Sequence, residues 1–179
     1  MQNNNSNNQP TGPVVQELHF YPIKSLRGLR TNELNLDKSG AVYDRQWMLI
    51  DDKNTFITQR QNPELAKIGV SFDEYGIELG QAEHGEIDFA TEEHEGPELQ
   101  VKIWKHEMPA QEVSSDVSKW FSDYLKKPVK LVRVAPSARR LWDPEDDQTT
   151  LRFTDARPLL VIGRASLEQL ELKAGVTIA

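Results

Sequence analysis

The sequence contains no cysteine, so disulfides, thiolate metal sites and thiol nucleophiles are excluded within this chain. It has no uninterrupted apolar run near the ~20 residues that cross a bilayer. The amino terminus lacks the basic-then-apolar order of a secretory signal. We therefore expect a cytoplasmic protein without a membrane segment.

Positive charge is also scarce: 21 Lys and Arg stand against 28 Asp and Glu, a net charge of -7. This balance argues against a protein that binds nucleic acid through its overall charge. Any anion must meet a local basic patch. At 179 residues, the chain has the size of one ordinary domain, or of one small domain plus a fragment of another.

Most of the chain has strand character. The Asn-rich residues 1–13 have almost no apolar side chains, and we expect a disordered tail there. Short strands are then expected in "VVQELHFY", "WMLID", "TFITQR", "GVSFD", "GIELG", "LQVKIW", around Val113, in "PVKLVRVA" and in "RPLLVIG". "WMLID" and "TFITQR" are expected to form a hairpin. Many short strands at near-regular spacing predict a small antiparallel barrel or sandwich.

Two segments have a helical pattern. In "SSDVSKWFSDYLKK", apolar residues at Val117, Trp120, Phe121, Tyr124 and Leu125 form one stripe. In "ASLEQLELKAG", Ser166 and Gln169 have the spacing of a capping box, and Gly175 stands where a left-handed terminator is common. The chain then stops at "GVTIA", strand-like residues with no successor to pair with. We expect the carboxy-terminal portion to be an incomplete domain.

A cationic cluster lies at the end of the first strand, in "YPIKSLRG". Lys24, Ser25, Arg27 and Gly28 could build an anion site there, because turn N–H groups point outward and glycine permits close approach. The alternative is that the cations only solvate a strand edge.

A second cation, Arg45, stands in "YDRQW" before the buried strand Trp47 to Ile50. Its planar guanidinium would be ordered either by the adjacent Asp44 or by a bound oxyanion. A third cation, Arg60, follows in "TQRQNP".

Three stretches in this order carry a resemblance: "YPIKSLRG", "GAVYDRQWMLIDDKNTFITQRQNPELAKI" and "LRFTDARPLLVIGRASLEQLE". Together they resemble the N-terminal β-barrel domain and the start of the MOSC domain, in the family that includes the mitochondrial amidoxime-reducing components and their bacterial relatives. The resemblance covers roughly residues 14–172, and three ordered motifs are more specific than any one of them.

The resemblance implies a mostly β (α+β) fold. A small antiparallel β-barrel of the MOSC N-terminal type would span residues 14–135, and an incomplete second β-barrel with short helices would span residues 136–179. It further implies that Lys24, Ser25 and Arg45 hold the molybdenum cofactor (molybdopterin), with Arg60 at the rim of the same pocket. The implied function is the cofactor-binding part of an oxidoreductase that reduces N-oxygenated compounds, with a small-molecule substrate and an electron-transfer protein as partners.

One departure from the family concerns activity. Catalytic members hold molybdenum through a cysteine after an Arg-Pro-Asn segment, and neither feature exists here. We therefore expect no redox activity and no tight cofactor binding from this chain alone. The alternative is a non-catalytic β-barrel that binds a small anion or a protein partner.

Other candidate sites are weaker. His19, His84, His94 and His106 show no zinc-type spacing, and His84 and His94 are expected to titrate in solvent. The carboxylates of "WDPEDDQ" (Asp143, Glu145, Asp146 and Asp147) suit a turn better than a magnesium site, with Arg139 and Arg140 as local charge balance. The acidic stretch "QAEHGEIDFATEEHEGPE" is expected to be a solvated hairpin tip or loop. A third possibility is that its residues 83–98 recognise a partner.

Overall fold

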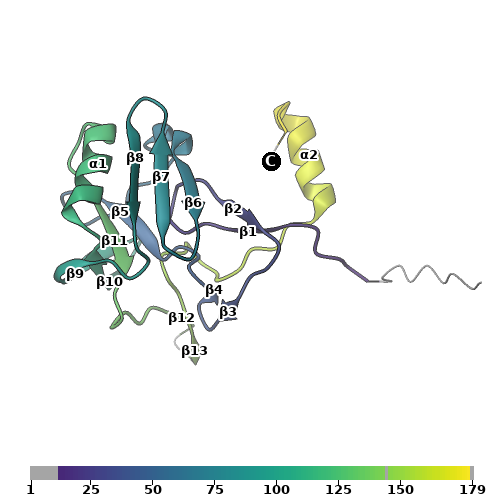
Figure 1. The fold of residues 1–179 in the computed structure, drawn as a ribbon. Helices are drawn as coiled ribbons and strands as arrows, with labels where there is room; N and C mark the ends of the chain where they lie inside the picture. The colour runs from purple at the N-terminus through teal and green to yellow at the C-terminus, as the bar shows by residue number, and fades with distance from the viewer. Residues whose placement is uncertain (1–11, 144, 178–179) are drawn as a thin grey trace, which may run out of the picture.

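The computed structural model describes residues 12–143 and 145–177. Nearly all of the expected tail lies outside this range. The described chain is mostly β, with two α-helices, so the predicted fold class is confirmed at this level (Figure 1).

The strands are β1 (Leu18–Phe20), β2 (Leu29–Thr31), β3 (Leu36–Asp37), β4 (Gly40–Ala41), β5 (Trp47–Ile50), β6 (Gly69–Phe72), β7 (Ile77–Gln81), β8 (Gly85–Phe89), β9 (Glu95–Ile103), β10 (His106–Glu112), β11 (Lys130–Val134), β12 (Leu141–Asp143) and β13 (Asp146–Thr150). The helices are the 3-10 helix η1 (Pro63–Lys67), α1 (Ser115–Leu125) and α2 (Arg164–Ala174).

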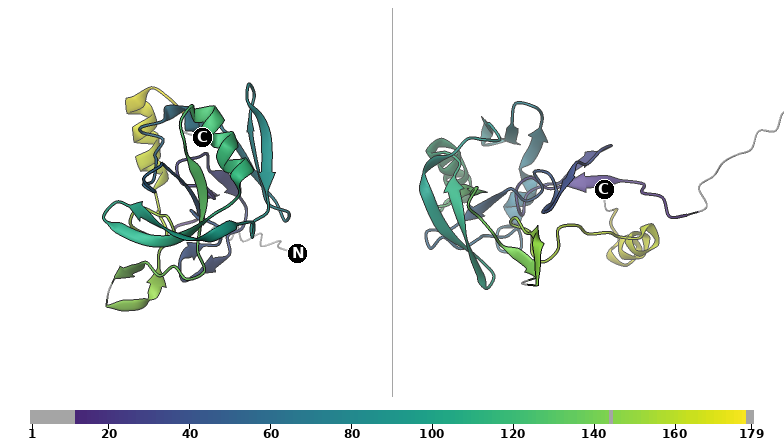
Figure 2. Two further views of the ribbon diagram at one scale, coloured as in Figure 1. Left: turned by 90° about the vertical axis from the view of Figure 1, so that its left-hand side faces the viewer. Right: turned by 90° about the horizontal axis from the view of Figure 1, so that it is seen from below.

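The strands form several small antiparallel sheets. A four-stranded sheet has the order β5-β11-β10-β9, and a three-stranded sheet has the order β6-β7-β8. The pairs β1-β2, β3-β4 and β12-β13 complete the set. Within the described residues, these sheets do not close into one barrel, which is where the structure departs from the expected barrel (Figure 2).

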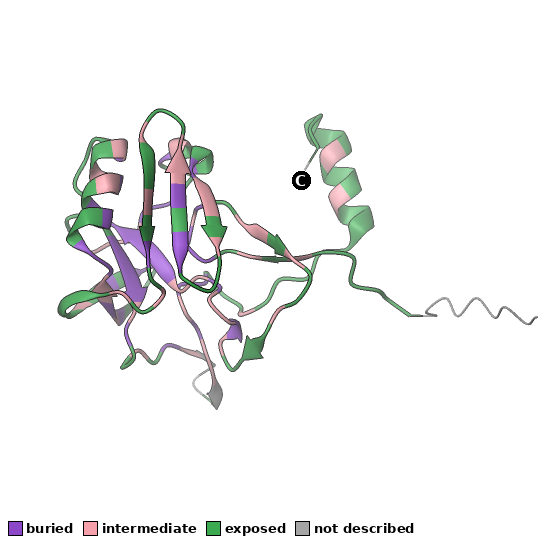
Figure 3. Cartoon of the chain, in the orientation of Figure 1, coloured by how far each residue is buried: buried purple, intermediate pink, exposed green. Residues whose placement is uncertain are grey.

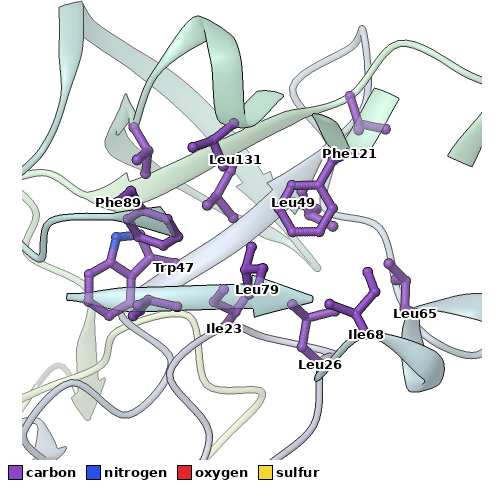
Figure 4. Close-up of a cluster of buried hydrophobic side chains, with 14 of the residues drawn as sticks. Ile23, Leu26, Trp47, Leu49, Leu65, Ile68, Leu79, Phe89, Phe121 and Leu131 are labelled. Atoms are coloured by element: carbon purple, nitrogen blue, oxygen red, sulfur yellow. The ribbon is translucent and has the colours of Figure 1, made fainter. Parts of the chain in front are cut away.

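All four residues of strand β5 are buried. Because side chains alternate along a strand, Trp47 and Leu49 enter one apolar cluster while Met48 and Ile50 enter the other. The first cluster fills the space between β5, β7 and α1, where Figure 4 shows Trp47, Leu79 and Phe121. The second cluster contains Phe153, far along the chain. The predicted buried strand is confirmed.

Helix α1 confirms its predicted apolar stripe. Val117, Phe121 and Leu125 are buried on the first cluster, and Trp120 and Tyr124 pack against it in part. The Ser114 hydroxyl accepts the Val117 N–H at the amino end. Lys126 adopts a left-handed conformation at the carboxyl end.

Several expectations about single elements are wrong. The expected hairpin return of "TFITQR" along β5 is confirmed, with an antiparallel bridge between Ile50 and Phe56 and Ile57 N–H donating to Leu49 O at 3.0 Å, but the segment is not a regular strand. The acidic stretch contains the turn of the β7-β8 hairpin, as expected, but it is not a hairpin tip or loop throughout, because β8 runs through it as the edge of a sheet and buries Phe89. Helix α2 begins two residues before Ser166, with Gly163 as its N-cap, whereas the expected left-handed Gly175 is confirmed.

The segment "RPLLVIG" is not a strand, although it is nearly all apolar. Among the described residues it pairs with no strand, so it lacks the backbone hydrogen bonds that an apolar sequence alone does not supply. Leu159, Leu160, Val161 and Ile162 are exposed, and none of the residues of α2 is buried. Figure 3 shows α2 coloured as exposed or intermediate throughout and standing apart from the sheets. Among the described residues, no helix is both long enough and apolar enough to span a membrane.

Candidate functional site

Backbone hydrogen bonds bring the first two motifs together. The Lys24 N–H donates to Trp47 O at 2.8 Å, and the Arg45 N–H donates to Tyr21 O at 2.8 Å. Ile23 and Trp47 form a parallel bridge between the two segments, and both side chains are fully buried. Apolar burial of these two anchors therefore fixes where the polar residues beside them point.

The four residues expected to hold the cofactor line one pocket of about 270 Å³. Lys24 and Ser25 come from the loop after β1, Arg45 from the turn before β5 and Arg60 from the turn after the return segment. The other residues that line the pocket are Tyr21, Leu26, Thr58, Gln59 and Asp155. The structure thus gathers these side chains at one place, while their cofactor-binding role stays a prediction.

Arg45 is held by its neighbour in the sequence. Its Nη1 donates to both carboxylate oxygens of Asp44, at 2.5 and 2.6 Å, and its guanidinium lies 4.3 Å from the centre of the Tyr21 ring. Asp44 is buried and also accepts the Tyr21 N–H at 2.7 Å. Of the two partners the sequence left open for Arg45, the structure shows Asp44 in place.

Arg45 and Ser25 both have positive φ angles, of 49° and 67°. Residues with a Cβ adopt this region at a conformational cost, and such costs gather at functional sites. Here the motif backbone holds both residues in the turns that line the pocket.

Lys24 is paired with a residue from the third motif. Its buried ammonium donates to Phe153 O at 3.0 Å and to Asp155 Oδ1 at 2.5 Å, and it lies 5.5 Å from the centre of the Phe56 ring. Burial lowers the pKa of Lys24, and the nearby cations Arg45 and Arg140 lower it further, against the opposing effect of Asp155. Lys24 is therefore not a cation at a solvated strand edge.

The segment that carries Asp155 is fixed by a buried arginine. Arg140 donates to the carbonyl oxygens of Arg152, Thr154 and Asp155, at 3.1, 2.7 and 3.2 Å. The sequence predicted charge balance for the acidic loop as the role of Arg140. In the structure, Arg140 holds the backbone of residues 152–155.

Asp155 also contacts Trp104, which lies beside Arg60. The Trp104 indole N–H donates to Asp155 Oδ1 at 2.9 Å, and the Arg60 guanidinium lies 5.6 Å from the centre of the Trp104 ring. Although burial raises the pKa of Asp155, hydrogen bonds from Lys24 and Trp104 hold it below its ordinary value.

A second, more open hollow of about 970 Å³ adjoins the first and shares Asp155 with it. Its other lining residues are Lys102, Trp104, Lys105, His106 and Glu107, which surround the turn between β9 and β10. Two cations and an exposed indole thus continue the site beyond Asp155. Sequence analysis missed Trp104, which shows no local signal, and Asp155, which lies within the third motif.

The remaining candidates form no metal centre among the described residues. His84 differs from expectation, because its ring packs edge-on against Trp120 and hydrogen-bonds Trp120 O at 2.9 Å. The side chains of Asp143, Asp146 and Asp147 lie outside the described part of the chain, so the choice between turn and magnesium site stays a prediction there.

Acidic residues of the segment 83–98 make internal contacts. Glu92 pairs with the buried Arg133 at 2.9 Å, and Glu95 accepts the Ser115 N–H at 2.9 Å. These two carboxylates are engaged in contacts within the fold, which weakens the idea of a dedicated acidic recognition loop.

Comparison with known proteins identifies a matching domain family and several similar proteins. The sequence model of the MOSC N-terminal beta barrel domain matches residues 12–128. Mitochondrial amidoxime-reducing component 1 of Mus musculus is 30% identical over 173 residues, which are 90% of this chain and 51% of that protein. Molybdenum cofactor sulfurase of Oryza sativa subsp. japonica is 27% identical over 177 residues, covering 88% of this chain and 21% of that protein.

A Bordetella bronchiseptica protein with a solution structure matches 59% of this chain and 91% of its own, with a TM-score of 0.45 and 14% identity. The chain spans about half the length of the amidoxime-reducing relatives that it matches.

Proposed function

Because the chain belongs to the family of the MOSC N-terminal beta barrel domain, we propose that it contributes Lys24, Ser25, Arg45 and Arg60 to a binding site for the molybdenum cofactor. The observation that carries the proposal is the single pocket that these four residues line. They come from three separate segments of the chain.

The donor set fits the polar part of such a cofactor. A phosphate accepts hydrogen bonds from an ammonium, a hydroxyl and a guanidinium, which Lys24, Ser25 and Arg45 supply. Asp44 holds the Arg45 fork in a fixed orientation, so part of the ordering cost of binding is met in advance.

The metal end of the cofactor has no matching ligand in this chain. Molybdenum calls for a soft thiolate, and the sequence contains no cysteine. When bound, the cofactor supplies the two-electron chemistry of an oxidoreductase. Within this proposal, the 179 residues bind and orient its pterin and phosphate, and redox activity needs a thiolate from elsewhere. Reduction of N-oxygenated compounds, with an electron-transfer protein as partner, is then proposed for a longer protein that contains this chain.

We also propose that residues 14–135 form the first domain and that residues 136–179 begin a second, MOSC-type domain. The exposed apolar residues Leu159 to Ile162 and the unburied helix α2 support this division. Exposed apolar surface of this kind is typical of segments that pack against further structure.

The test is the cofactor content of a longer protein that contains this chain, measured as molybdenum and released pterin per polypeptide. Lys24→Ala and Arg45→Ala should each lower that content about tenfold or more, since each removes a charged hydrogen-bond donor. Arg27→Ala is the matched control, because Arg27 belongs to the same motif but is exposed and does not line the pocket. Unchanged content in the first two variants would refute these assignments.

The second candidate is a non-catalytic module that binds a small anion, and the missing thiolate favours it for the isolated chain. Both candidates use the same cations. They differ in whether a protein with a downstream cysteine carries molybdenum, so elemental analysis of the short and the long forms separates them.

A further inference from the structure

The two ion pairs of the pocket differ in which partner is buried. In the first pair, the carboxylate is the buried partner: the Asp44 side chain is 6% exposed and Arg45 is 32% exposed. In the second pair, the cation is the buried partner: the Lys24 side chain is 8% exposed and Asp155 is 60% exposed. The first arrangement fixes a cation at the pocket wall. In the second arrangement, a solvent-facing carboxylate is paired with an ammonium that is held in the protein interior.

Lys24 needs an anionic partner because its ammonium is desolvated. Burial of an unpaired charge is costly, and the ion pair with Asp155 offsets that cost. The buried ammonium cannot turn to solvent without leaving Phe153 O and the pocket. Once another anion takes its place beside Lys24, the Asp155 carboxylate can turn to water at little cost, because most of its surface is already hydrated.

Asp155 also stands between the two hollows of the site. It lines both of them, and it is the only carboxylate among the described residues that line the 270 Å³ pocket. Its Oδ1 accepts from both Lys24 and Trp104. If Asp155 turns away, an ammonium and an indole N–H become available together, and the two hollows become continuous.

We propose that Asp155 is an exchangeable counter-ion of Lys24, which an anionic ligand replaces when it binds. The geometry favours a phosphate-type group, since a dianion brings more charge and more acceptor oxygens than the carboxylate that it displaces. A singly charged ligand gains little from the exchange. Asp155 therefore selects for phosphate-bearing ligands, and the Trp104 wall receives the part of the ligand that extends beyond the phosphate.

This inference rests on the proposed anion-binding function of the pocket, and it makes a separate prediction. The probe is inorganic pyrophosphate, titrated calorimetrically into the 179-residue chain at constant ionic strength. Asp155→Asn should bind it about tenfold more tightly than the native chain, because one opposing charge and one competitor for Lys24 are removed. Asp155→Ala should show a gain of the same direction.

Two controls isolate the effect. Asp52→Asn removes the same charge from an exposed turn outside the pocket, and it should leave affinity unchanged. In the Lys24→Ala background, adding Asp155→Asn should give no further gain, since the competition is for Lys24. Circular dichroism during heating establishes that each variant is folded.

Equal or weaker binding by Asp155→Asn, with binding that still depends on Lys24, would overturn the inference and leave the pocket's proposed function intact. A gain that persists without Lys24 would overturn the inference as well. Pyrophosphate binding that ignores both Lys24 and Arg45 would instead overturn the proposed function together with the inference.

Discussion

The ammonium of Lys24 and the carboxylate of Asp155 form a 2.5 Å ion pair across 131 positions of the sequence. This contact connects the first motif of the chain to the third. It means that the candidate site is assembled from segments that meet only when the second apolar cluster forms around Phe153, two residues before Asp155.

The buried ammonium predicts a pH dependence of stability. Because the pKa of Lys24 lies below its ordinary 10.5, the unfolded chain binds more protons than the native chain between the lowered pKa and 10.5. The free energy of unfolding should therefore rise with pH across that interval. Lys24→Met should abolish this rise, whereas Met at the exposed Lys53 should not. Urea denaturation at several pH values, from about 8 to about 10, measures it. An unchanged slope in Lys24→Met would contradict the prediction.

Phe153 should matter for both stability and the site. Its side chain is fully buried, and its carbonyl oxygen accepts from Lys24. Phe153→Ala should cost about 3–5 kcal/mol of unfolding free energy, and Phe153→Leu about 1 kcal/mol. Chemical denaturation measures both costs. Pyrophosphate affinity should fall in Phe153→Ala, because the carbonyl oxygen that positions the Lys24 ammonium is displaced. A cost below about 1 kcal/mol for Phe153→Ala would show that the segment is not anchored this way.

Gly28 supports the site through an aromatic ring. A Cβ at this position would collide with the ring of Tyr21, which stacks on the guanidinium of Arg45. Close approach does require glycine here, although the group that approaches is Tyr21. Gly28→Ala should weaken pyrophosphate binding several-fold by displacing Tyr21, as measured by calorimetry.

A double-mutant cycle tests this path. In a Tyr21→Ala chain, adding Gly28→Ala should have almost no further effect on affinity, because the collision is gone. Additive losses would mean that Gly28 acts independently of Tyr21.

The exposed apolar segment after Pro158 should contribute little to the stability of the isolated chain. Replacing Leu160 and Val161 by Ser should change the unfolding free energy by less than about 0.5 kcal/mol and should lower the binding of a hydrophobic dye. The same change at buried Leu131 should be strongly destabilising. Large destabilisation by the Leu160 and Val161 replacements would show that the segment packs onto the described body.

Elements with a strong local pattern were predictable from the sequence. The continuous apolar run of β5 and the stripe of α1 were recognised because burial on a strand or a helix repeats at a fixed period. The three motifs also indicated which cations belong together. By contrast, β8 was missed because its sequence is acidic, and pairing with β7 is what makes it a strand. The segment "RPLLVIG" was wrongly predicted as a strand because its sequence is apolar, although it pairs with no described strand.

By itself, the sequence determined the secondary structure of the most regular segments, the family and the identity of Lys24, Ser25, Arg45 and Arg60 as a candidate set. Only the tertiary structure decided that Lys24 is buried, that Asp155 is its partner and that Trp104 stands behind them. Periodicity along a chain encodes which face of an element is apolar, whereas an ion pair between distant residues depends on how separate elements pack around a shared core.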